Sequence, residues 1–167
     1  MNSLTANLHL LMASFYRPTR QRPAILIEAG AFPSDRHAVE SQVRWHGFDP
    51  ATDLIELAAD EPAGTISDAA VAEAIARHGE RLALVLMPGV QYRTGQAFDL
   101  KTIAGQARAV GAVAGFDLAH AFGNLDLALH DSGADFAVWC HYKYGNGGPG
   151  TVRSEEHTSE LQSLTNL

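Results

Sequence analysis

The sequence predicts an α/β fold, specifically a partial three-layer α/β/α sandwich built around a mostly parallel sheet. Five short apolar runs alternate with segments in which apolar residues recur at helical spacing. The runs are apolar throughout instead of alternating with polar residues, which is typical of strands that are buried on both faces. A helical segment between successive strands is the connection that a parallel sheet requires.

The expected strands are compact apolar runs, such as "LALVLM", bounded by glycine, proline or polar residues. Their length is that of a single strand and far below that of a membrane span. In chain order they cover residues 24–29, 53–58, 81–89, 112–120 and 134–141.

The expected helices are marked by apolar residues three or four positions apart and by capping residues. The first begins near the start of the chain and stops before Pro18. Ser34 or Asp35 is predicted to cap the second helix, and Ser67 and Asp99 to cap the next two. The expected helices cover residues 2–16, 32–47, 68–79 and 99–110, with a short helical connection at 124–133.

Composition indicates a globular domain and argues against several classes of partner. The 167 residues are 46% hydrophobic and 19% charged, which is ordinary for one globular domain. A net charge of -7 argues against nucleic acid, and no apolar run is long enough for a membrane span. The single cysteine, Cys140, and the lack of a signal-peptide pattern favour a reducing, cytoplasmic location. No metal-binding residues are predicted.

Polar side chains with distinctive chemistry follow the last two predicted strands. Asp117 and His120 follow one strand, and Tyr142 and Lys143 follow the next. Ligands of parallel sheets bind at the carboxyl ends of the strands, so these side chains are expected to share one crevice. Pyridoxal 5'-phosphate requires a lysine for its aldehyde, an acid for its ring nitrogen and donors for its phosphate. These residues therefore make pyridoxal 5'-phosphate a candidate cofactor.

Each of these residues also has a simpler structural interpretation. Asp117 could cap a turn at the end of a strand, Lys143 could be solvated, and His120 could be a hydrogen-bonded structural histidine. The glycine-rich "GNGGPG" could be only a turn. From the residues alone, a non-catalytic α/β module that binds a phosphate ligand remains an alternative.

Four segments resemble the kynureninases and occur in the expected order over nearly all of residues 1–150. They are "MNSLTANLHLLMASFYRPT", "EAGAFPSDRHAVESQ", "LMPGVQYRTGQAFDL" and "GFDLAHAFGNLDLALHDSGADFAVWCHYKYGNGGPG". Cysteine desulfurases and other enzymes with an aminotransferase-like large domain share the strand-end acid and the lysine, but are not expected to share the last segment. A desulfurase-like lyase of the same fold is the second interpretation.

The resemblance implies the large domain of the fold type I transferase-like enzymes that depend on pyridoxal phosphate. It implies a hydrolase acting on a carbon–carbon bond, which converts kynurenine or 3-hydroxykynurenine to anthranilate or 3-hydroxyanthranilate and alanine. That reaction belongs to tryptophan catabolism and NAD biosynthesis, and the intact enzyme is expected to be a cytoplasmic homodimer.

The resemblance also implies roles for particular residues. Lys143 would bind the cofactor aldehyde and, together with Tyr142, transfer protons. Asp117 would pair with the ring nitrogen. The full set of implied cofactor-binding residues is Phe32, Pro33, Ser34, Asp35, Asp117, His120, Tyr142 and Lys143.

The end of the chain does not continue this pattern. Residues 1–152 are expected to form part of the cofactor-binding domain, whereas residues 153–167 are polar and lack periodicity. The stretch from Arg153 to Ser163 resembles a translated sequencing-library adapter, so residues 153–167 are predicted to be a non-native, disordered tail. The resemblance places a phosphate-binding turn before Met1 and further groups after Gly150. The chain as it stands is therefore expected to be inactive and to fold poorly.

Overall fold

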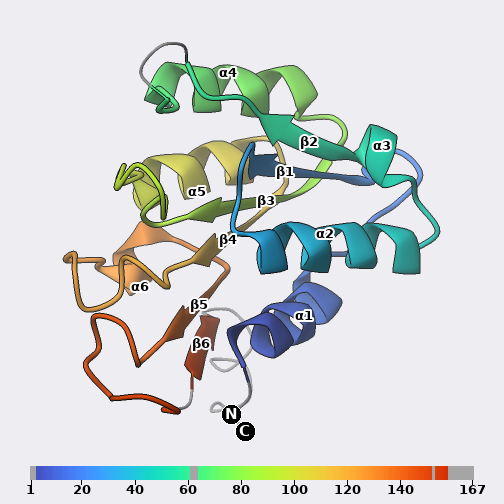
Figure 1. Cartoon of the computed structure of the whole chain (residues 1–167). Coiled ribbons are helices and arrows are strands. Elements are labelled where there is room, and N and C mark those ends of the chain that lie inside the picture. Colours follow the sequence, from blue (N-terminus) through green and yellow to red (C-terminus); the bar gives the residue numbers. More distant parts are fainter. Residues whose placement is uncertain (1–2, 61–63, 152, 158–167) are drawn as a thin grey trace, which may run out of the picture.

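A six-stranded sheet forms the centre of the molecule, as the computed structural model in Figure 1 shows. The structure describes residues 3–60, 64–151 and 153–157. Within these ranges the strand order is β2-β1-β3-β4-β5-β6. The strands are β1 (Ala24–Glu28), β2 (Leu54–Leu57), β3 (Leu82–Pro88), β4 (Val113–Asp117), β5 (Phe136–Cys140) and β6 (Arg153–His157). β1 to β5 are parallel to one another, which confirms the predicted α/β architecture.

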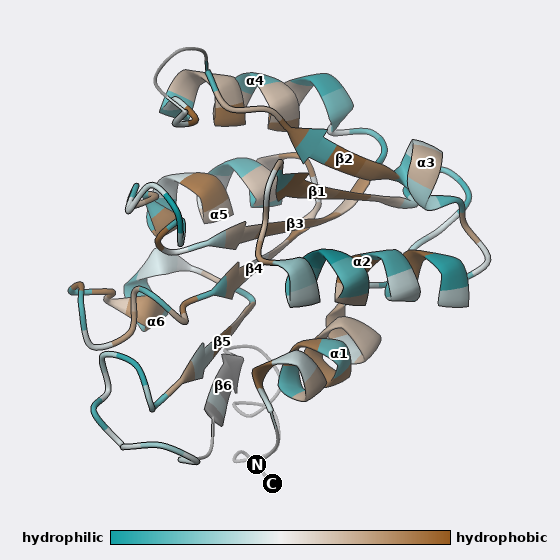
Figure 2. Ribbon diagram, in the orientation of Figure 1, coloured by the Kyte–Doolittle hydropathy of each residue, from teal (hydrophilic) through white to brown (hydrophobic). Residues whose placement is uncertain are grey.

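Helices cover both faces of this sheet (Figure 1). α1 and α2 pack on one face, whereas α4 and α5 pack on the other. Figure 2 shows the consequence, with hydrophobic strands in the middle and hydrophilic residues along the outer faces of helices such as α2. The helices are α1 (Leu4–Phe15), α2 (Pro33–Trp45), α3 (Pro50–Asp53), α4 (Asp68–His78), α5 (Leu100–Ala109) and α6 (Leu129–Ser132).

The strands are apolar along their whole length because their side chains belong to two hydrophobic clusters, one on each face of the sheet. Along β1, Ile25 and Ile27 belong to the cluster under α1 and α2, whereas Leu26 belongs to the cluster under α4 and α5. Successive side chains of a strand point to opposite faces, so a strand covered on both sides needs an apolar residue at every position. All five residues of β1 are buried, including Glu28 at its end.

The start of α2 differs from the prediction. Phe32 occupies the N-cap position without a capping side chain, and Pro33 is the first helical residue. Proline suits that position, because the N–H group that it lacks would be unpaired at a helix start. Ser34 and Asp35 therefore lie in the first turn and do not cap the helix, and the Asp35 side chain is buried.

Other caps agree with the prediction, and one short helix was not predicted. The side chains of Ser67 and Asp99 accept backbone hydrogen bonds at the starts of α4 and α5, as expected. Asp49 and Pro50 start the single turn of α3, which shortens the strand predicted at 53–58. Such a short helix has no periodicity, so the apolar pattern could not reveal it.

Residues 153–157, which the sequence predicts to belong to a disordered tail, instead form β6. This strand lies antiparallel to β5, with Phe136 opposite His157 and Cys140 opposite Arg153. The outer edge of β5 offers backbone N–H and C=O groups that any extended neighbour can pair with. Because the pairing uses the backbone, the side-chain pattern of these residues does not predict it.

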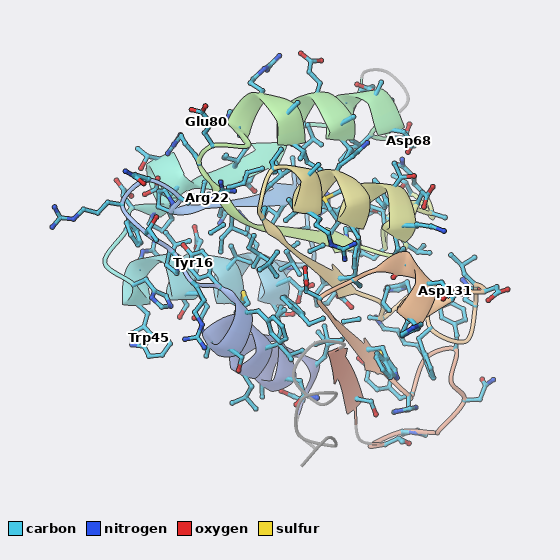
Figure 3. All side chains as sticks on the ribbon, turned by 180° about the vertical axis from the view of Figure 1, so that it is seen from behind. Tyr16, Arg22, Trp45, Asp68, Glu80 and Asp131 are labelled. Carbon is cyan, nitrogen blue, oxygen red and sulfur yellow. The ribbon has the colours of Figure 1, made fainter. Side chains whose placement is uncertain are left out.

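Polar contacts hold together the end of the sheet at which the strands begin. The Tyr16 hydroxyl donates a hydrogen bond to the Pro23 carbonyl at 2.5 Å, just before β1. The Arg22 guanidinium donates to the carbonyls of Leu82 and Val110 at 2.7 and 2.6 Å, linking β3 to the end of α5. Figure 3 labels Tyr16 and Arg22 in this region. None of the helices in the described ranges combines the length and the apolar character of a membrane span.

Candidate functional site

A cleft of about 300 Å³ opens at the carboxyl ends of the parallel strands. Its volume falls within the range of small-molecule sites. The order β2-β1-β3 places a topological switch point between β1 and β3, which is where α/β sheets bind ligands. Seven of the eight predicted site residues line the cleft, namely Phe32, Ser34, Asp35, Asp117, His120, Tyr142 and Lys143. Pro33 does not line it and instead begins α2.

Asp117 is the last residue of β4, and this position at the carboxyl end of the strand places it in the cleft. Its backbone is paired with Pro88 of β3 on one side and with Val138 of β5 on the other. Its Oδ1 atom accepts a hydrogen bond from the Ala119 N–H at 2.7 Å, which fixes the orientation of the carboxylate. This is the turn-capping contact that the simpler interpretation of Asp117 foresaw. The same carboxylate also lines the cleft, so the two interpretations are compatible.

Lys143 and His120 are in direct contact inside the cleft. The Lys143 Nζ atom lies 2.9 Å from His120 Nε2 and 5.8 Å from the centre of the Phe32 ring. Burial lowers the pKa of His120, the charge of Lys143 lowers it further, and Asp117 acts in the opposite direction. A neutral imidazole with its proton on Nδ1 accepts a hydrogen bond from the lysine ammonium at Nε2. The pair thus holds Lys143 at a defined position over the aromatic ring.

Asp35 lies beside Asp117 as a second carboxyl group in the cleft. Burial raises the pKa of Asp35, and the charge of Asp117 and a hydrogen bond with it raise that pKa further. Ser34, whose hydroxyl donates to Asp35 Oδ1 at 3.2 Å, and the charge of Lys143 act in the opposite direction. Desolvation is the largest of these effects, so Asp35 favours its neutral form.

Aromatic side chains form one wall of the cleft. The rings of Phe32 and Tyr92 meet edge to face, with centroids 5.2 Å apart, and the Tyr92 hydroxyl accepts a hydrogen bond from Arg93 Nε at 2.8 Å. Phe32 is 44% exposed even though it lines the cleft, so part of its ring can pack against a ligand. Tyr92 was not among the predicted site residues, although it lies within the "LMPGVQYRTGQAFDL" segment.

The N-terminus of α1 also reaches the cleft, which sequence reasoning missed. Ser3, Leu4 and Thr5 line it, and the Ser3 hydroxyl caps the helix by accepting from the Ala6 N–H at 3.1 Å. The first N–H groups of a helix and its dipole attract anions. The start of α1 therefore offers N–H groups to the cleft in addition to the phosphate-binding turn that the resemblance places before Met1. The signal in the sequence was a serine and a threonine on either side of the first helical residue.

Glu28 is a further lining residue that was not predicted. It is the last residue of β1 and only 2% exposed. Burial raises the pKa of Glu28 to about 7, Asp117 adds to this effect, and a hydrogen bond with Gln91 opposes it. The available signal was a single acid at the end of the otherwise apolar run "AILIEA".

Comparison with known proteins finds relatives of this chain by sequence. No protein-family model matches the chain. Curated kynureninases from Xanthomonas euvesicatoria pv. vesicatoria and Xanthomonas axonopodis pv. citri are 75% and 74% identical to it over 152 residues. These residues are 91% of this chain but 36% of each relative, so the chain spans little more than a third of their length.

Solved structures show the same fold at low sequence identity. The alanine–glyoxylate aminotransferase of Nostoc sp. matches 99% of this chain and 41% of its own, with a TM-score of 0.73 and 18% identity. The cysteine desulfurase of Thermococcus onnurineus matches 96% of this chain and 37% of its own, with a TM-score of 0.73 and 16% identity. The fold of this chain is therefore that of one part of these enzymes. The resemblance to the kynureninases that the sequence motifs predict is confirmed over 152 residues of this chain.

Proposed function

We propose that this chain is the cofactor-holding part of a kynureninase. The whole protein would be a hydrolase that cleaves a carbon–carbon bond of kynurenine or 3-hydroxykynurenine, giving alanine and anthranilate or 3-hydroxyanthranilate. It would act as a cytoplasmic homodimer in tryptophan catabolism and NAD biosynthesis. The names of the relatives support this proposal. The observation that carries it is that Lys143 and Asp117, from two neighbouring strands, line the same cleft.

The residues of the cleft fit pyridoxal 5'-phosphate group by group. The Lys143 amine suits an aldehyde, and the Asp117 carboxylate suits a protonated pyridine nitrogen. The half-exposed ring of Phe32 offers a surface for an aromatic ring. The start of α1, near Thr5, offers N–H groups for a phosphate. These four elements are the set of partners that the cofactor requires.

When bound, pyridoxal 5'-phosphate supplies an electron sink for a substrate carbanion. In this proposal Lys143 would hold the cofactor aldehyde, and its Nζ atom would take and return a proton during the reaction. His120 positions that nitrogen through the 2.9 Å contact. Tyr142 lines the same part of the cleft and is the second candidate for proton transfer.

The carboxyl groups of the site would divide two functions between them. Asp117 would hold the positive charge of a ring nitrogen. Asp35 lies beside it but favours its neutral form, so it can donate a hydrogen bond without adding a second negative charge. This combination would bind one cation in the cleft without the repulsion of two adjacent carboxylates.

The test exploits the fact that the sequence contains two lysines, Lys101 and Lys143. The chain is incubated with pyridoxal 5'-phosphate and reduced with borohydride, and the labelled peptide is then identified by mass spectrometry. We expect the label on Lys143, which lies in the cleft, and not on Lys101, which is exposed on α5. Lys143→Ala should remove the label and the absorption of the bound cofactor, whereas Lys101→Ala should keep both.

Labelling of Lys101 alone, or equal labelling of both lysines, would contradict the proposed site. Failure of the chain to bind pyridoxal 5'-phosphate at all would favour the non-catalytic phosphate-binding module.

Product analysis separates a kynureninase from a desulfurase of the same fold. In an intact protein that contains this segment, kynurenine should yield alanine and anthranilate, and cysteine should yield no sulfur transfer. The structure gives a reason, because Cys140 is fully buried within β5 and cannot carry sulfur to a substrate in solution. Sulfur release from cysteine without kynurenine cleavage would favour the desulfurase.

A further inference from the structure

Glu28 has a buried oxygen without a hydrogen-bond partner. Within the described part of the chain, its Oε2 atom has no such partner, although the residue is only 2% exposed. Burying a polar atom without a partner is costly, so such an atom in a cleft points to a ligand or to a proton. Glu28 ends β1 and lines the cleft that contains Lys143.

The side chain of Gln91, next to Glu28, is oriented so that its amide nitrogen faces Glu28 and acts as a hydrogen-bond donor. The Gln91 Oε1 atom accepts hydrogen bonds from the N–H groups of Arg93 and Thr94 at 2.6 and 3.0 Å. These contacts orient the amide so that its Nε2 faces the Gly30 carbonyl, at 3.4 Å, and the Glu28 carboxyl. Gln91 therefore offers Glu28 a single amide donor, which does not offset its burial.

Asp117 connects Glu28 to the rest of the site. Its charge raises the pKa of Glu28, of Asp35 and of His120. Lys143 is a cation in the cleft, and its charge lowers the pKa of Asp35 and of His120. An Arg93 guanidinium nitrogen lies 3.9 Å from the position that a Cβ atom on Gly30 would occupy.

A metal ion does not account for these carboxyl groups. Among the described residues, no group of three or more His, Cys, Asp and Glu side chains is arranged to hold a metal. Besides Lys143, protons and a bound organic cation can therefore match the negative charge at Asp117.

We propose that Glu28 is a positioning residue that acts through Asp117, holding a proton in the free cleft and releasing it to solvent when a cationic ring nitrogen binds against Asp117. This inference rests on the proposed function for the identity of the cation. It assigns a role to the buried Oε2 atom of Glu28, whose burial without a hydrogen-bond partner would otherwise destabilise the fold without explanation. It also predicts that binding of the ring becomes tighter as the pH rises through the titration of Glu28.

The first experiment needs no cofactor. The chain is labelled with ¹³C at the glutamate side-chain carboxyls, and the signals are followed by NMR as the pH is changed. Glu28→Gln identifies the Glu28 signal by its loss. We expect the midpoint of that signal to lie near 7 and to fall in the Asp117→Asn variant. A midpoint near the ordinary glutamate value of 4.5, or one that does not change in the Asp117→Asn variant, would overturn the proposal.

The second experiment measures the consequence for binding. The affinity for pyridoxal 5'-phosphate is measured between about pH 6 and about pH 8 for the natural chain, Glu28→Gln and Glu28→Asp. Relative to Glu28→Gln, the natural chain should gain affinity on the order of tenfold over this range, because a nearby charge acts strongly at low dielectric. Glu28→Asp should recover part of the gain, and the exposed control Glu80→Gln, labelled in Figure 3, should behave as the natural chain does.

The two experiments separate the two proposals. If the cofactor binds and Glu28→Gln has the same pH profile as the natural chain, the role of Glu28 is wrong and the proposed function survives. If Glu28 titrates as expected but the natural chain does not bind the cofactor, the coupling to Asp117 is supported and the proposed function is wrong.

Discussion

The hydrogen bond between Lys143 and His120 illustrates how single residues define this site. The two residues are 23 positions apart in the sequence, yet their nitrogens lie 2.9 Å apart. Burial and the charge of Lys143 both lower the pKa of His120, so the imidazole stays neutral and can accept the contact. A histidine that was protonated instead would repel the lysine.

Sequence reasoning at this scale succeeded where chemistry and position coincide. Asp117 and Lys143 were predictable because parallel strands place their carboxyl ends along one edge. Glu28 was not, because burial is the main cause of its raised pKa and Asp117, which is distant in sequence, adds to it. Tyr92 was missed because an aromatic residue in a turn carries no chemical signal of its own.

The first prediction concerns the stability contributed by Glu28. Its pKa rises from an ordinary 4.5 to about 7 on folding, so the folded state binds more protons than the unfolded state between these values. The chain should therefore lose stability as the pH rises through this window. Glu28→Gln lacks this loss, and its advantage over the natural chain should grow by up to about 3 kcal/mol from acidic to slightly alkaline pH. Urea unfolding at several pH values measures the difference, and a constant difference would contradict the assignment.

At the scale of elements, the contact between β4 and β5 depends on a glycine. A Cβ atom added to Gly115 would lie 2.2 Å from the ring of Phe136, which is fully buried against Phe15. The glycine thus provides room for a large aromatic ring at the junction of two strands. In contrast, Gly105 in α5 has no atom within 4 Å of such a Cβ.

These two glycines form a matched pair for the second prediction. Gly115→Ala should destabilise the chain by about 1–3 kcal/mol, because the methyl group forces the Phe136 ring or the strand to move. Gly105→Ala should stabilise it by about 0.5–1 kcal/mol, since alanine restricts the unfolded chain and fits a helix. Denaturant midpoints of both variants test this, and destabilisation of similar size in both would show that the ring contact is not responsible.

The elements themselves were largely predictable, with informative exceptions. The caps at Ser67 and Asp99 were found because each precedes a clear helical pattern. The start of α2 was misplaced because Pro33 initiates the helix without a side-chain cap. β6 was not predicted because backbone pairing along a strand edge leaves no periodic signal.

At the scale of the whole molecule, the role of residues 153–157 is the main open question that experiment can decide. They complete the sheet next to β5. We propose that residues 153–167 are not part of the cofactor-binding unit. The expected poor folding of the chain also stays a prediction, to be checked by thermal unfolding. A single sharp transition would contradict it.

The third prediction concerns removal of residues 153–167. Pyridoxal 5'-phosphate should still label Lys143, because the cleft residues are retained. The outer edge of β5 should become unpaired, so its amides should exchange faster with deuterium and the chain should associate more readily. Hydrogen exchange and light scattering measure these effects. Loss of labelling after the deletion would instead assign the tail a part in the site.

The assembly of the cleft from three separate strands and the turn that follows β5 has a consequence for how the protein is made. Its walls are contributed by residues from Ser3 to Lys143, so most of the chain must be present before the walls can meet. A nascent polypeptide still held on the ribosome with β5 inside the exit tunnel would not yet have Lys143 in the cleft. Capture of the cofactor at this lysine would therefore report that β1, β3, β4 and the segment after β5 have come together.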